Sequence, residues 1–145
     1  MKNIIFIMLL IPNFVFAGSI YIPPLNTVIL KAEHTYKSTW TPTEEQAQRA
    51  LEKAVYFLDH PTDVNERQMR ELAKIKKNLS LYKVQFVGFE INGKKRIWCN
   101  FFGGRDFDGW EKKIVLVKDG GFWFWQIEYD LINDICVNFR SNGYA

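Results

Sequence analysis

The chain has few of the residues from which catalytic and metal centres are most often built. Its 145 residues include two histidines, His34 and His60, and two cysteines, Cys99 and Cys136. The histidines lie on different segments without a ligand-type spacing or a CxxC pair, so we expect no zinc site. The sequence contains no GxSxG motif. A Cys–His pair formed only in space stays open, but we expect no metal, no cofactor and no catalytic set, which favours a non-enzymatic protein.

A strong charge of either sign is also lacking. The chain carries 19 lysines and arginines against 16 aspartates and glutamates, a net charge of +3. A nucleic-acid-binding protein would show a strongly basic stripe. The lysines and arginine at positions 94–96 lie beside a predicted turn, where solvated side chains are ordinary. We therefore expect no nucleic-acid partner.

The sequence has one prominent apolar run, at residues 4–11. It follows Lys2 and precedes the compact residues Val15, Phe16 and Ala17. The run is shorter than the ~20 residues that a membrane-spanning helix needs, and this order is typical of a secretory signal peptide. No cysteine follows it to carry a lipid. We expect residues 1–17 to be a signal peptide and the remaining chain to act in the periplasm or outside the cell, without a membrane anchor.

Residues 18–40 are predicted to form an extended arm, because the prolines at positions 23 and 24 restrict the backbone. The apolar run at 27–30 is either a short strand or a cover for the core edge. Residues 41–145 are predicted to form a single α+β domain.

Two helices are predicted at the start of this domain. Thr41 as the cap, Pro42 at the first position and Glu44 as the capping-box partner predict a helix over residues 41–58. Apolar residues at helical spacing, three of them alanines, give it a stripe that can lie close to a sheet. A second helix is predicted from about Val64 to Lys77.

After Leu79 the pattern changes to that of strands, which are predicted at residues 81–91, 95–102, 113–118, 122–129 and 135–140. The turns Asn92-Gly93 and Asp119-Gly120-Gly121 predict two hairpins. The order of elements predicts helices packed on a curved antiparallel meander of four or five strands.

The first turn also sets a register. It places Ile97 opposite Gly88, Cys99 opposite Phe86 and Phe101 opposite Val84, and this apolar face should meet the helix. The second hairpin instead carries aromatic residues on both faces. Either both sides of the sheet are partly covered, or one face is a binding surface.

The two cysteines raise the question of a disulfide. An oxidising compartment permits one between Cys99 and Cys136. In a simple meander they lie three strand spacings, about 14 Å, apart, whereas a disulfide needs Cα atoms within ~7 Å. The bridge therefore forms only if the strand order is not sequential or the sheet closes.

The segment 103–110 is the strongest candidate for a contact site. It combines three glycines with Arg105, Asp106, Phe107, Asp108 and Trp110. Arginine and tryptophan are enriched at interface hot spots, and loops on a rigid sheet often carry function. The alternative is that Phe107 and Trp110 fold back to plug the core. Asp106 and Asp108 lack the further ligands of a calcium loop.

A second candidate is a small-ligand or enzymatic pocket inside a cone-shaped sheet. Its aromatic walls would come from Trp98, Trp123 and Trp125. Such a pocket requires several hundred Å³ of space and convergent polar groups, whereas a filled apolar core excludes it.

A pattern of turns and aromatic residues runs through the second half of the chain, at positions 85–89, 92–95, 97–102, 110–112, 117, 119–121, 125, 129–130 and 142–143. In this pattern the chain resembles small exported bacterial proteins of unassigned function with a cystatin-like or nuclear-transport-factor-like fold. The resemblance covers about residues 41–143. That fold hosts inhibitors, binding modules and some enzymes, so the resemblance bears on the fold and says little about function. The lack of a catalytic set, beside an aromatic and Arg-bearing loop, leads us to expect an exported binding protein with a protein partner. One form of this is an inhibitor or immunity protein of a cell-envelope enzyme or toxin.

Overall fold

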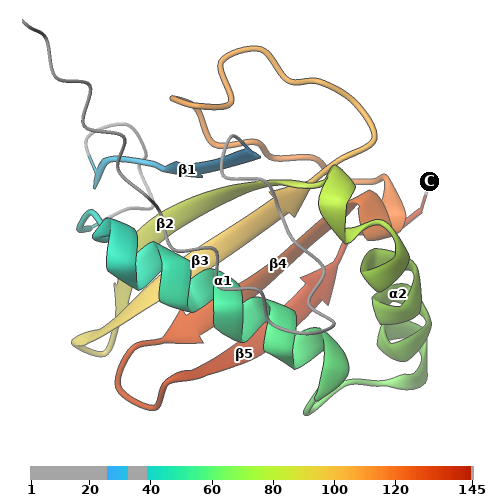
Figure 1. Cartoon of the computed structure of the whole chain (residues 1–145), viewed down its shortest axis with the longest axis horizontal. Coiled ribbons are helices and arrows are strands. Elements are labelled where there is room, and N and C mark those ends of the chain that lie inside the picture. The colour runs from blue at the N-terminus through green and yellow to red at the C-terminus, as the bar shows by residue number, and fades with distance from the viewer. Residues whose placement is uncertain (1–25, 33–38, 145) are drawn as a thin grey trace, which may run out of the picture.

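The computed structural model describes residues 26–32 and 39–144 and shows an α+β architecture, in which two helices pack on a mixed five-stranded sheet (Figure 1). The predicted signal peptide, most of the arm and His34 lie outside the described residues. The elements are β1 (Thr27–Ile29), α1 (Glu44–Asp59), α2 (Glu66–Lys77), the 3₁₀ turn η3 (Leu79–Leu81), β2 (Lys83–Ile91), β3 (Lys94–Phe102), the 3₁₀ turn η4 (Gly121–Trp123), β4 (Phe124–Asp130) and β5 (Ile135–Ser141).

The sheet has the order β1-β2-β3-β4-β5. Strands β2 to β5 form the antiparallel meander that the turns predicted, but β1 pairs with β2 in parallel. The prediction of a purely antiparallel sheet was therefore wrong. A parallel neighbour needs a long crossover connection, and the stretch from residue 30 to residue 82, which contains both helices, supplies it. None of the described helices is long and apolar enough to cross a membrane.

Helix α1 begins two residues later than predicted. Its N-cap is Thr43, whose hydroxyl accepts a hydrogen bond from the Gln46 backbone N–H at 3.2 Å, while the Gln46 amide oxygen accepts from the Thr43 backbone at 2.9 Å. The expected cap, Thr41, instead accepts a hydrogen bond from the Ala32 backbone N–H at 3.0 Å. Thr41 thus ties the segment that follows β1 to the start of the domain, and the next threonine caps the helix.

The first hairpin has the predicted register. Ile97 lies opposite Gly88, Cys99 opposite Phe86 and Phe101 opposite Val84. This face of the sheet meets the helices, and the alanines of α1 at positions 47, 50 and 54 are at most 4% exposed in the same core. The small side chains let the helix lie close to the strands, as the apolar stripe predicted.

The predicted second hairpin does not form. Residues 113–118 are not a strand, and residues 119–121 lead into η4. Strand β4 pairs directly with β3, with Phe124 opposite Phe102. A connecting loop, residues 103–120, joins these two strands.

This connecting loop covers part of the sheet face opposite the helices. There Phe102, Trp110, Val115 and Phe124 form a second, smaller core. Figure 1 shows α1 crossing one side of the sheet and the long orange connection arching over the other. The aromatic residues on both faces are explained in this way, because each face has its own cover.

Both cysteines are buried and free. Cys99 is on β3 and Cys136 on β5, with β4 between them. Two strand spacings are about 10 Å, which is more than the ~7 Å between Cα atoms that a disulfide allows. A bridge would need a non-sequential strand order or a closed sheet. The strand order is sequential and the sheet is open, so neither condition is met.

Candidate functional site

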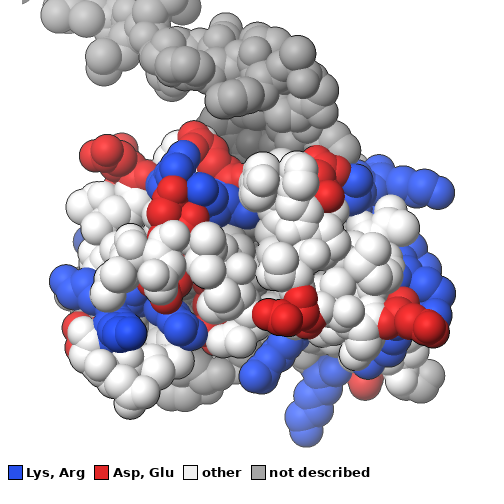
Figure 2. Space-filling model, turned by 90° about the horizontal axis from the view of Figure 1, so that it is seen from below, with Lys and Arg blue, Asp and Glu red and all other residues white. Residues whose placement is uncertain are grey.

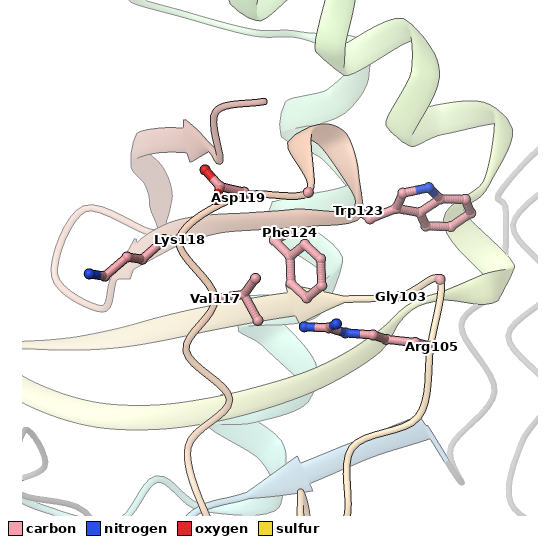
Figure 3. Close-up of a pocket in the computed structure, with 9 residues that line it drawn as sticks. Gly103, Arg105, Val117, Lys118, Asp119, Trp123 and Phe124 are labelled. Atoms are coloured by element: carbon pink, nitrogen blue, oxygen red, sulfur yellow. The ribbon is translucent and has the colours of Figure 1, made fainter. Parts of the chain in front are cut away.

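An open cleft of about 440 Å³ lies where β3 leaves the sheet and η4 enters β4 (Figure 3). One wall is the start of the connecting loop, Gly103, Gly104 and Arg105, and the opposite wall is its end, residues 117–120. Phe124 and Trp123 complete the lining. A smaller cleft of about 160 Å³ adjoins the same three residues and extends past Asp106 toward Lys83.

The first wall is held against Trp123. The Gly103 backbone N–H donates to the Trp123 carbonyl at 2.9 Å. Gly104 has a φ of +79°, and a Cβ there would lie 3.2 Å from the Trp123 ring. Glycine is therefore required at Gly104 by both its backbone conformation and the close approach of the ring.

The second wall is held by the C-terminal segment. The Asn142 side-chain amide donates to the Val117 carbonyl at 2.5 Å and to the Asp119 carbonyl at 3.0 Å. The Asn142 backbone N–H donates to the Phe124 carbonyl at 2.9 Å. The cleft thus lies between two walls that are both hydrogen-bonded to ordered structure.

Arg105 is the charged side chain that lies across the cleft. Figure 3 shows its guanidinium beside the Phe124 ring, while Lys118 extends outward from the opposite wall. The Arg105 guanidinium lies 4.8 Å from the Phe107 ring centroid and 5.9 Å from that of Phe124. Within residues 26–32 and 39–144 no carboxylate forms a salt bridge with it, and the adjacent Asp106 pairs with Lys83 at 3.2 Å.

Trp110 packs as the core plug that the sequence left as an alternative. Its side chain is buried, with its ring 5.8 Å from that of Phe102 in an edge-to-face arrangement. Lys83 places its ammonium 5.1 Å from the Trp110 ring centroid. Phe107 is half-buried against the same small core, and Asp108 is exposed. Of the predicted contact residues, the exposed ones are therefore Arg105, Asp106 and Asp108.

A ladder of buried amides fixes the connecting loop to the sheet. Gln85, Asn100 and Gln126 lie side by side on β2, β3 and β4. The Gln85 amide donates to the carbonyls of Trp110 at 2.6 Å and Lys113 at 2.7 Å, and its oxygen accepts from the Val115 backbone at 2.9 Å. The Asn100 amide donates to Gln85 at 3.1 Å and to the Val115 carbonyl at 2.8 Å.

The sequence reading missed this ladder, although a signal was present. A glutamine and an asparagine interrupt the apolar stretches of two strands, at positions that the predicted hairpin register places opposite each other. Buried polar side chains need hydrogen-bond partners, and here the partners are backbone groups of the loop. The Gln85 and Asn100 side chains thus give the backbone of residues 110–115 the hydrogen bonds that a neighbouring strand would otherwise give it.

The three tryptophans of the alternative pocket do not meet. Trp125 is fully buried on the helix side, stacked on Phe101 with ring centroids 3.7 Å apart. Trp98 projects from the opposite face of the sheet, because it alternates with Cys99. Trp123 lines the open cleft. The helix side of the sheet is a filled apolar core rather than a pocket.

A polar cluster around Asp134 joins a turn to a helix. Asp134, in the β4–β5 turn, accepts hydrogen bonds from Arg49 at 2.9 Å and from the Tyr129 hydroxyl at 2.9 Å, and pairs with Lys53 at 2.9 Å. Hydrogen bonds from Arg49 and Lys53 hold the pKa of Asp134 well below its usual range. This cluster joins the turn to α1.

The thiols are poor nucleophiles in this setting. Burial raises the pKa of Cys136 to about 12 and that of Cys99 well above its usual value. A thiolate is the reactive form, so both groups are inert at neutral pH. In the described ranges no three His, Cys, Asp or Glu side chains gather as metal ligands would.

On the face of the molecule shown in Figure 2, lysines and arginines are interspersed with aspartates and glutamates.

Comparisons with protein-family models, with curated proteins and with solved structures found no match to this chain.

Proposed function

We propose that this chain is an exported, non-enzymatic binding protein that contacts a protein partner through the rim of the cleft. The observation that carries the proposal is Arg105, an exposed arginine that lies across an aromatic-floored cleft without a carboxylate partner in the described part of the chain. Arginine beside aromatic residues is typical of interface hot spots. We propose the periplasm or the outside of the cell as the place of action because of the apolar run at residues 4–11 of the sequence.

The rigidity of the cleft supports this proposal. The amide ladder of Gln85 and Asn100 and the hydrogen bonds of Asn142 hold the connecting loop without a partner present. A preformed site loses less conformational entropy on binding than a loop that must first become ordered. Inhibition of a cell-envelope enzyme or toxin, in the manner of an immunity protein, is one form of this function.

Capture of a partner from an envelope extract of the producing cells tests the proposal. Wild-type protein, Arg105→Ala and Arg70→Ala are immobilised separately, and the retained proteins are compared by mass spectrometry. Arg70 is an exposed arginine of α2 that does not line the cleft, so its replacement makes the same change in charge elsewhere. We expect one protein to be retained by wild type and Arg70→Ala and lost from Arg105→Ala. Equal retention by all three would contradict the proposal.

A further inference from the structure

We propose that the cleft recognises an acidic segment of its partner, in which the side-chain carboxylate of a Glu or Asp pairs with Arg105 and an adjacent apolar side chain packs on Trp123 and Val117. This inference rests on the proposed function and names the chemistry of the partner. The juxtaposition that supports it is the Arg105 guanidinium, which has no carboxylate partner among residues 26–32 and 39–144, beside an aromatic ring of an open cleft.

The guanidinium is positioned for a carboxylate. The Phe107 and Phe124 rings hold its carbon at 4.8 Å and 5.9 Å from their centroids, so the rings interact with the cation but take none of its directional hydrogen bonds. A guanidinium presents its N–H donors as a planar fork that matches the two oxygens of a carboxylate. Aromatic contacts orient this fork in advance and reduce the entropy lost on pairing.

The charges around the cleft favour an anion. Its lining includes two cationic side chains, Arg105 and Lys118, and one acidic side chain, Asp119. The neighbouring acid, Asp106, is already paired with Lys83 at 3.2 Å. An incoming carboxylate therefore meets a local excess of positive charge, while an incoming ammonium would be repelled by Arg105.

The floor of the cleft requires an apolar group beside that carboxylate. Trp123 and Val117, which are half-buried, line it together with the buried Phe124, and a small inorganic anion would leave the exposed apolar surface of Trp123 and Val117 in contact with water. Burial of that apolar surface favours binding. A volume of about 440 Å³ suits one or two side chains of a protein segment rather than a large ligand.

The occupant is the interior of a chain rather than a chain end. The larger and the smaller cleft meet along Gly103, Gly104 and Arg105, so the depression continues on both sides of the arginine. A segment lying across this strip places residues in both clefts and its acidic side chain at Arg105. A terminal carboxylate would fill only one side.

Titration of the ¹⁵N-labelled full chain with short peptides, followed by NMR, tests the inference. The probes are acetyl-Leu-Glu-Leu-amide, its neutral counterpart acetyl-Leu-Gln-Leu-amide, and acetyl-Leu-Gln-Leu with a free C-terminal carboxylate. We expect the Glu peptide to bind in the millimolar range typical of a small contact, and to shift the Gly103, Gly104 and Trp123 signals. The two Gln peptides should bind at least tenfold more weakly.

Two variants complete the experiment. Arg105→Gln should lose at least tenfold in affinity for the Glu peptide with otherwise unchanged spectra, whereas Arg70→Gln should bind as wild type does. Absence of binding to wild type, equal binding of the Glu and Gln amides, or unchanged binding by Arg105→Gln would each overturn the inference. Equal binding of the free-acid peptide would overturn the assignment to an interior segment. If the peptides fail while partner capture still depends on Arg105, the proposed function stands and this inference alone falls.

Discussion

Replacing Gln85 with leucine should detach the connecting loop from the sheet. Gln85 is fully buried, and its side chain makes four hydrogen bonds, three of them to the loop backbone and one to Asn100. Leucine has a similar volume, so the substitution removes these bonds without opening a large cavity. Each bond contributes about 1 kcal/mol net, which gives roughly 4 kcal/mol for the set.

Part of this loss should be recovered. Lys113 is exposed, so water can hydrate its carbonyl once the loop shifts, whereas the buried Val115 N–H is left without a partner. Once water replaces the Lys113 bond, three bonds of about 1 kcal/mol each remain lost, and we therefore expect a net loss of about 3 kcal/mol in the free energy of unfolding for Gln85→Leu.

Urea denaturation followed by tryptophan fluorescence measures this loss. Gln126→Leu is the matched control, because Gln126 belongs to the same ladder but is half-buried and makes a single long hydrogen bond of 3.4 Å. The free energy of unfolding of Gln126→Leu should fall by less than about 1 kcal/mol. If Gln85→Leu loses no more than Gln126→Leu, the amide ladder does not hold the loop, and the argument that the cleft is preformed is wrong.

Three further predictions follow from the described contacts. Trp110→Ala should lower the free energy of unfolding by about 3–5 kcal/mol, the range for truncation of a buried aromatic side chain, and a urea-measured loss below about 1 kcal/mol would contradict the core-plug assignment. Because the pKa of Asp134 is lowered in the folded protein, its contribution to stability is present above its unfolded pKa of about 4 and is lost as the pH falls below that value. The difference in unfolding free energy between wild type and Asp134→Asn should therefore be larger at pH 7 than at pH 3, and a difference independent of pH would refute this. Cys99 and Cys136 should not react with a thiol reagent in the native protein and should both react in urea, since they are buried and free; absence of reaction in urea would reveal a disulfide.

The helices and the first hairpin were predictable because their signals act over a few residues. Asn92-Gly93 provides two adjacent positions that tolerate positive φ, and both residues adopt it, at 51° and 75°. That turn alone sets which residues of β2 and β3 face each other. Helix α2 likewise begins at a local capping box, between Asn65 and Gln68. For α1 the predicted cap was wrong, because Thr43 caps the helix while Thr41 accepts a hydrogen bond from Ala32, which lies outside the helix.

The cleft was only partly predictable. Its glycines and Arg105 stand out in the sequence as an unusual loop, but the opposite wall comes from residues 117–120, which the pattern assigned to a strand and a turn. Trp110 was left between two interpretations, because composition does not tell whether a loop tryptophan packs inward or outward. The contact with Phe102 determines that it packs inward.

The sequence by itself determined the elements whose causes lie within a turn of helix or a hairpin: the presence of two helices and the β2–β3 register. Only the tertiary structure decided that β1 pairs in parallel and that residues 113–118 form no strand. The reason is that the partners of these segments are distant in the chain. The hydrogen bonds that hold the loop come from Gln85, 25 to 30 residues away from the backbone groups it binds, and β1 finds its partner 57 residues further along, where Thr27 lies beside Val84. Such contacts exist only once the sheet has formed, so no local pattern predicts them.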